Sequence, residues 1–268
     1  MMVPPTTAYR GHPVGPRGAS SWPLGCSARL GTARRWPEPR RIGASIMLCL
    51  LAAACASHPP PPDWQLNAKA AIERSVAAYL SGNARVDAQE LERARSEIAR
   101  TGRADLLARI ELTRCAAQAA SLVFGPCAGF EALRADADAA GRAYADYLAA
   151  RIAAPDIALL PEPQRAVAAG AGAGAGARGD APNLAALRAI DDPLSRLVAA
   201  GVLFEAGRAD PQVITIAIAT ASAQGWRRPL LAWLGVELRR AEQSGAVEDA
   251  ARLRRRIALV QQGGGAAP

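Results

Sequence analysis

Carboxylates are the main side chains of residues 63–262 that could do acid–base chemistry, and this region contains no histidine to pair with them. Serine–histidine–aspartate and cysteine–histidine catalysis are therefore excluded within it, and the commonest zinc ligand is missing. Two carboxylates could still cleave a glycoside. The acidic residues are, however, scattered over expected helix caps and solvated helix faces, as in the pair Glu248 and Arg252. We therefore expect no catalytic residue, no metal site and no cofactor.

Cys55 ends a segment of a different kind. The basic pair Arg40-Arg41 is followed by 13 mostly apolar residues, 42–54, of which the last three are alanines, and then by Cys55. A basic flank, a short apolar stretch and small residues before a cleavage site are typical of a secretory signal. The apolar stretch is too short to span a bilayer, which takes about 20 residues.

With a cysteine directly after the small residues, segment 40–57 resembles the signals of bacterial lipoproteins. The resemblance implies that a signal at 40–54 is cut off and that Cys55 carries the lipid. The lipoprotein pattern prefers a large aliphatic residue three places before the cysteine, where this chain has Ala52. Ala56, rather than an aspartate, follows the cysteine, which implies sorting to the outer membrane. The alternative is a buried apolar segment with an ordinary cysteine.

Residues 1–39 precede this segment, and this stretch alone is longer than a signal usually is. They are rich in proline, glycine and arginine without hydrophobic periodicity, so we expect a disordered leader. Either the true start lies downstream, near Leu30, or the leader is real and is cleaved. The net charge of +8 belongs mainly to residues 1–54, which hold seven arginines and one glutamate. The mature chain is nearly neutral, and we expect no nucleic-acid partner.

From Cys55 onward the sequence predicts an all-α fold. Residues 55–62 contain four consecutive prolines and are expected to form a semi-rigid tether. An N-terminal helical region follows at 63–165, with Asp63 as the cap of its first helix. Apolar residues at helical spacing, with glycine and proline stops, predict helices at 63–81, about 87–101, 105–123 and 130–152. Residues 159–164 are expected to form a loop.

Residues 166–181 contain alternating glycine and alanine and are predicted to be a flexible linker. A C-terminal region of helical hairpins is expected at 182–262, followed by a tail at 263–268. Prolines behind capping aspartates mark helix starts at Pro193 and Pro211, and Pro229 opens a further helix. The segment 213–220 is β-branched and alternates, but the proline start favours a helix.

The step from Pro193 to Pro229 is 36 residues, and each such step holds one helical hairpin. This part resembles the tetratricopeptide class of helical repeats, although the Trp-Leu-Gly-Tyr order typical of that class is absent. The predicted fold is therefore antiparallel helical hairpins in a bundle or a short repeat array.

Cys115 and Cys127 are the two thiols left once Cys55 is lipidated, and in the oxidising compartment that the resemblance implies they are expected to form a disulfide. The bond requires their Cα atoms to lie within about 7 Å. The alternative is two small buried apolar residues.

Two surface features could bind a partner. Trp226, Arg227 and Arg228 have the composition of an interaction hot spot, although tryptophans also fill alanine-rich cores. A basic cluster near the end of the last helix could contact lipid phosphates or an acidic partner, or could simply be a solvated face that favours the helix dipole. Its members are Arg252, Arg254, Arg255 and Arg256.

These features predict a non-catalytic, lipid-anchored protein of the cell envelope that presents helices to a protein partner. A carrier of a small ligand or lipid is the second hypothesis. It requires an apolar cavity between helices, whereas the abundance of alanine favours close packing. An enzyme acting on cell-wall glycans is the third, and it requires a carboxylate buried in a cleft.

Overall fold

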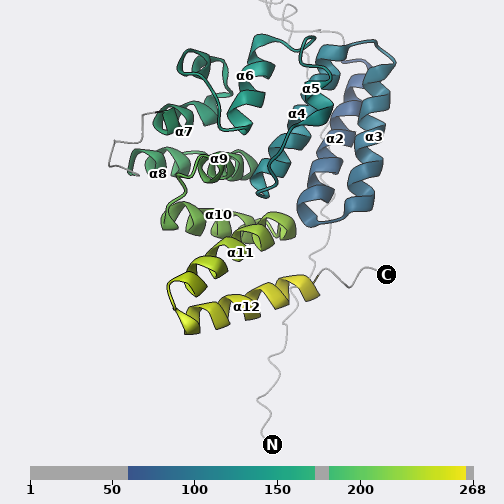
Figure 1. Cartoon of the computed structure of the whole chain (residues 1–268). Coiled ribbons are helices and arrows are strands. Elements are labelled where there is room, and N and C mark those ends of the chain that lie inside the picture. Colours follow the sequence, from purple (N-terminus) through teal and green to yellow (C-terminus); the bar gives the residue numbers. More distant parts are fainter. Residues whose placement is uncertain (1–59, 173–180, 264–268) are drawn as a thin grey trace, which may run out of the picture. The chain divides into compact units, whose positions relative to one another are not determined.

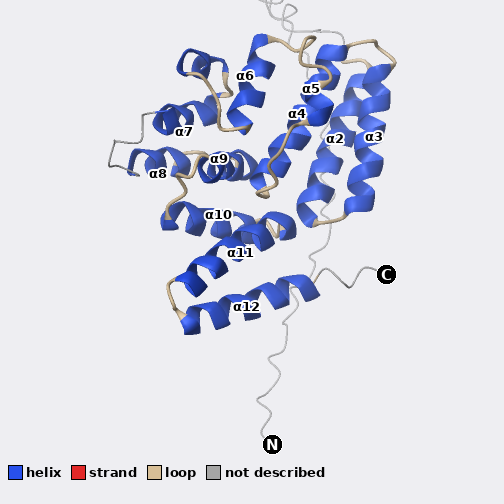
Figure 2. Ribbon diagram, viewed as in Figure 1, coloured by secondary structure: helices blue, strands red, loops and turns tan. Residues whose placement is uncertain are grey.

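The computed structural model describes residues 60–172 and 181–263, and every element in these ranges is helical (Figure 1 and Figure 2). The predicted all-α fold is thereby confirmed. The chain divides into the units Met1–His58 and Pro59–Pro268, and all helices described below belong to the second unit. The predicted leader, signal and lipidation site lie outside the described residues. None of the described helices combines the length and the apolar character that a membrane crossing requires.

The first three helices agree with the predicted pattern except at their ends. They are α2 (Asp63–Ser81), α3 (Ala84–Ala99) and α4 (Ala104–Ala120). Pro62, not Asp63, occupies the N-cap position of α2, so the predicted cap is wrong. Helix α3 begins three residues before Asp87, because the Asn83 side chain caps it by accepting a hydrogen bond from the amide of Val86.

The single helix predicted for 130–152 is wrong, because the chain breaks it into α5 (Ala128–Glu131) and α6 (Ala139–Leu148). The break lies before Asp138, whose extended backbone and side chain start α6 by accepting a hydrogen bond from the amide of Gly141 at 2.6 Å. The short 3₁₀ helix η2 (Ala154–Leu159) follows. Apolar spacing indicated buried residues such as Phe130, Ala137 and Tyr147 but could not show the interruption between them.

The predicted linker at 166–181 is wrong for its first half. Residues 166–172 belong to α7 (Glu162–Gly172), and α8 (Ala181–Arg188) follows after residues 173–180, which lie outside the described residues. Val167 and Ala168 of α7 are completely buried. Burial of these two side chains against the core stabilises a helix that glycine alone would disfavour.

The C-terminal helices are α9 (Pro193–Glu205), α10 (Pro211–Ala223), α11 (Arg227–Gln243) and α12 (Val247–Gln262). Asp192 and Asp210 cap the first two as predicted, and residues 213–220 are helical. Pro229 does not open α11, which begins two residues earlier, behind Trp226. Helix α11 therefore starts 34 residues after α9, which is the tetratricopeptide step of about 34 residues.

Helices α4 and α9 approach each other closely in the core. Gly201 of α9 faces the α4 backbone so closely that a Cβ atom there would overlap the carbonyl oxygen of Ala119. Beside this contact, the fully buried indole of Trp233 donates a hydrogen bond to the carbonyl oxygen of Ala120 at 3.1 Å. Small residues on two helices thus bring three elements together at the end of α4.

A buried hydrogen-bond chain joins α6, α7 and α9. The phenol of Tyr147 donates to the side-chain oxygen of Gln164 at 2.7 Å, and the Gln164 amide donates to the carbonyl oxygen of Ser195 at 3.0 Å. Burial raises the pKa of Tyr147 well above its usual value. The phenol therefore stays protonated and keeps its role as donor.

We predict that Gly201→Ala destabilises the protein by about 1–3 kcal/mol, because the added methyl group must push α9 away from α4. Gly235→Ala is the matched control, since no atom lies within 4 Å of a Cβ built there on α11. This control should stabilise the protein by about 0.5–1 kcal/mol through helix propensity. Chemical denaturation of both variants measures the two changes, and equal effects would show that α4 and α9 are not in close contact.

Candidate functional site

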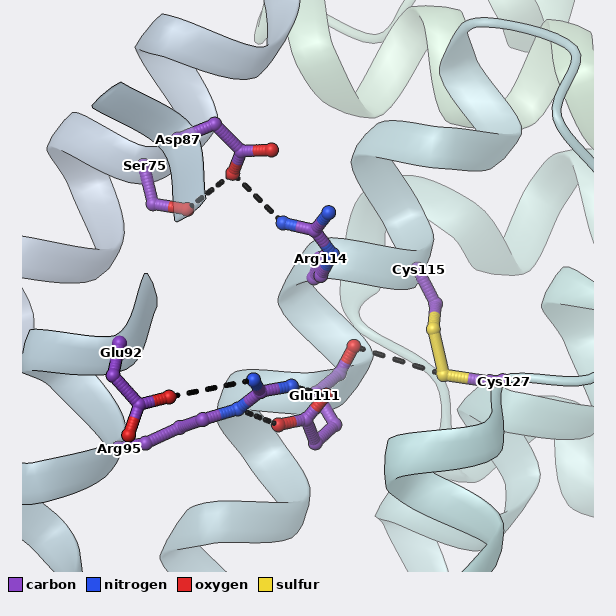
Figure 3. A network of polar contacts seen from close by, with 8 residues as sticks. All are labelled: Ser75, Asp87, Glu92, Arg95, Glu111, Arg114, Cys115 and Cys127. Atoms are coloured by element: carbon purple, nitrogen blue, oxygen red, sulfur yellow. Dashed lines mark hydrogen bonds and ion pairs between the residues drawn. A yellow bond between two sulfur atoms is a disulfide. The ribbon is translucent and has the colours of Figure 1, made fainter. Parts of the chain in front are cut away.

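Cys115 and Cys127 are joined in a disulfide (Figure 3). Cys115 lies in α4 and Cys127 precedes α5, with their Cα atoms 6.0 Å apart, inside the range that the bond requires. The sulfur of Cys127 also lies 3.7 Å from the carbonyl oxygen of Glu111. A bond of this kind contributes about 2–4 kcal/mol, and it fixes the loop after α4 against α5.

Two buried carboxylates lie between α2, α3 and α4, and each is paired with an arginine (Figure 3). Arg95 donates to both oxygens of Glu111, at 2.6 and 2.9 Å. Asp87 accepts hydrogen bonds through one oxygen from Ser75 at 2.8 Å and from Arg114 at 2.7 Å. The side chains of Asp87 and Glu111 are only 5% and 7% exposed.

These carboxylates hold helices together rather than facing a substrate. Neither Asp87 nor Glu111 lines any of the three cavities described below. Arg95 binds both oxygens of Glu111, and Asp87 is held through one oxygen by Ser75 and Arg114. The glycan-cleaving hypothesis requires a carboxylate buried in a cleft. Asp87 and Glu111 are buried, but they do not line these cavities.

The sequence contained a signal for Asp87 that the helix prediction missed. Asp87, Leu91, Ala94 and Ile98 continue one helical spacing, and all four are buried. A charged residue at a core position of an amphipathic helix requires a buried partner. Arg114, which is distant in sequence, provides it.

Trp226, Arg227 and Arg228 are half-buried and make contacts within the chain, and their role as an interaction surface stays a prediction. Arg228 stacks on the ring of Tyr79, with 4.3 Å from its guanidinium carbon to the ring centre, and donates to the Tyr79 carbonyl oxygen at 2.8 Å. Arg227 lies against the carbonyl oxygen of Gly82, and Trp226 packs on the cluster that contains Tyr79. The three residues join the start of α11 to the end of α2.

The basic cluster of α12 is exposed, and most of its members have partners. Arg252 pairs with Asp249, Arg254 pairs with Glu242 at 2.5 Å, and Arg256 donates to Ser222 at 3.3 Å. Helix α12 has no basic residue in its last turn, so the cluster is not placed to favour the end of the dipole. The exposed Arg255 makes none of these contacts.

A cavity of about 550 Å³ opens beside the disulfide, contrary to the expectation of close packing throughout. Its walls come from the ends of α4, α6 and α9, from the loop at 123–127 and from α5. Apolar side chains such as Phe124 and Leu148 share the lining with four charged ones, Glu131, Arg134, Arg151 and Glu205. The volume is in the range of small-molecule sites, about 300–1,000 Å³.

Two further cavities, of about 290 and 540 Å³, lie along α11 and α12, and the larger one also borders α10. Glu237 lines both, and one of its carboxylate oxygens is buried without a hydrogen-bond partner. Within residues 60–172 and 181–263, no group of three or more His, Cys, Asp or Glu side chains is placed to hold a metal ion.

Comparison with known proteins identifies no relative. No protein-family model, no curated protein and no solved structure matches this chain. The likeness to lipoprotein signals and to tetratricopeptide repeats stays a prediction. Function is therefore inferred from the residues and their geometry.

We predict that Arg114→Met destabilises the protein by about 3 kcal/mol, because Asp87 would stay buried with Ser75 as its remaining partner. Arg109→Met is the matched control, since Arg109 pairs with Asp138 where both side chains are more than half exposed. This control should lower the free energy of unfolding by less than about 1 kcal/mol. Urea denaturation compares the two variants, and a small loss for Arg114→Met would show that the buried pair is not needed.

Proposed function

We propose that this protein is a non-catalytic lipoprotein of the cell envelope, anchored through Cys55, whose helices bind a protein partner. The position of Cys55 carries the proposal. This residue follows the basic pair and the apolar run, and it lies four residues before Pro59, where the compact second unit begins. A lipid at this place would leave a short proline-rich spacer before α2 at Asp63.

The non-catalytic role is supported by the chemistry of residues 63–262. They contain no histidine, and the buried carboxylates Asp87 and Glu111 are bonded to arginines. Helices that pack closely through small side chains and are joined by arginine–carboxylate pairs are suited to holding a fixed surface. That surface is the working part of a scaffold.

The exposed side of α12 is the surface we assign to the partner. Only Ala250 of this helix is fully buried, and Leu259 is 69% exposed. Arg255 lies one turn before Leu259 on the same face. An apolar residue beside a cation without an ion pair suits a protein partner with acidic and apolar side chains.

The lipid anchor is tested by intact mass and membrane fractionation of the protein expressed in a bacterium with lipoprotein machinery. We predict a species that begins at lipid-bearing Cys55 and sediments with membranes. Cys55→Ala should abolish both properties. Cys49→Ala, six residues earlier in the same apolar run, should retain them. A soluble protein that keeps residues 1–54 would contradict the anchor, and its +8 charge would then favour an anionic partner.

The partner surface is tested by placing a photoreactive amino acid at Leu259, with a second variant at Leu66, which is 51% exposed on α2, as the control. We predict a reproducible cross-link to one envelope protein from position 259 and none from position 66. Arg255→Glu should reduce that cross-link by reversing the charge that the partner faces. Equal labelling from both positions would contradict a partner site on α12.

A further inference from the structure

The cavity beside the disulfide lies where three helices end. Gln118 and Ala119 are in the last turn of α4, Leu148 is the last residue of α6 and Glu205 is the last residue of α9, and all four line the cavity. Each helix end carries a partial negative charge of about half an elementary charge. None of the three helices has a basic residue in its last turn to offset it.

The charged side chains around the cavity add to this negative field. Arg134 is held by two carboxylates, by Glu131 at 2.7 Å and by Asp146 at 3.2 Å, so this trio has one excess negative charge. The hydrogen bond from Arg134 holds the pKa of Glu131 below its usual value, which keeps it ionised. Glu205 is exposed at the end of α9 and brings a second negative charge, while Arg151 is the one lining cation outside the trio.

Most of the other side chains that line the cavity are apolar. Phe124 stacks on Phe204 with 6.3 Å between ring centres, and the disulfide holds the neighbouring loop. Leu122 and Ala150, which follow α4 and α6, adopt left-handed backbone with φ of 58° and 54°. Such residues cost roughly 1–2 kcal/mol each, and backbone strain of this kind clusters at functional sites.

We propose that this cavity binds a small organic cation, an ammonium group on a short apolar body. The ammonium would lie near Glu205 and the three helix ends, where the field is most negative. The apolar body would lie against Leu148, Phe124 and the disulfide. The site is independent of the lipid anchor and of the α12 surface, since none of its lining residues belongs to α12.

The test uses three probes that share one apolar body and differ in charge: hexylammonium, 1-hexanol and hexanoate. Each is titrated into the purified full-length protein and followed by calorimetry and by amide shifts in NMR. We expect hexylammonium to bind at least about tenfold more tightly than hexanoate, with shifts confined to the ends of α4, α6 and α9. Raising the salt concentration should weaken the binding of hexylammonium and leave the binding of hexanol unchanged.

Three variants separate the charge of the cavity from a general effect of net charge. Glu205→Gln should weaken the binding of hexylammonium roughly fivefold, because it removes the unpaired carboxylate without changing the shape of the side chain. Arg151→Gln should strengthen it by a similar factor. Glu248→Gln, on the exposed first turn of α12, should have no effect.

Three results would overturn the assignment. Hexanoate binding that depends on Arg151 would make this an anion site. Equal binding of all three probes would make it an apolar pocket without charge selection. Absence of any shift at the ends of α4, α6 and α9 would show that the cavity takes no ligand of this class. None of these results bears on lipidation or on the cross-link from Leu259.

Discussion

The approach of α4 to α9 at Gly201 is the contact on which the rest of this fold depends. A helix pair can come this close only where one partner lacks a side chain, and Gly201 lies against the carbonyl oxygen of Ala119. That carbonyl belongs to the end of α4, where Trp233 of α11 also binds. The central helices and the C-terminal hairpins therefore share one large core that begins at α4, whereas α2 and α3 pack against α4 through two smaller clusters. The cavity described above lies where α4 and α9 end.

The same contact determines which surfaces are free. With α11 held at the end of α4, Arg227 and Arg228 reach α2 and are used in joining it to α11. A cluster that has the composition of a binding surface thus also joins two helices of this chain. The exposed side of α12, at the end of the array, and the cavity at the helix ends remain accessible, so we assign the partner and the ligand to these two places.

The sequence predicted the fold class and most helices because glycine and proline stops and helical spacing are local signals. Asp192 and Asp210 are examples, since a capping aspartate directly before a proline defines a helix start by itself. The break before Asp138 and the helix through 166–172 were not predictable in this way. Both depend on burial against elements that are distant in sequence. The cavity could not be predicted either, because it is formed by the ends of three helices whose meeting depends on the fold.

Native-state hydrogen exchange in increasing urea tests most directly whether the contact between α4 and α9 joins the whole array. If the contact at Gly201 has the role assigned to it, amides of α2, α4, α9 and α11 will merge into one unfolding transition with a common free energy and a common urea dependence. If α2–α4 and α9–α12 instead exchange with different free energies and different urea dependences, the chain consists of two independent bodies. The contact between α4 and α9 would then not be the one that holds the structure together.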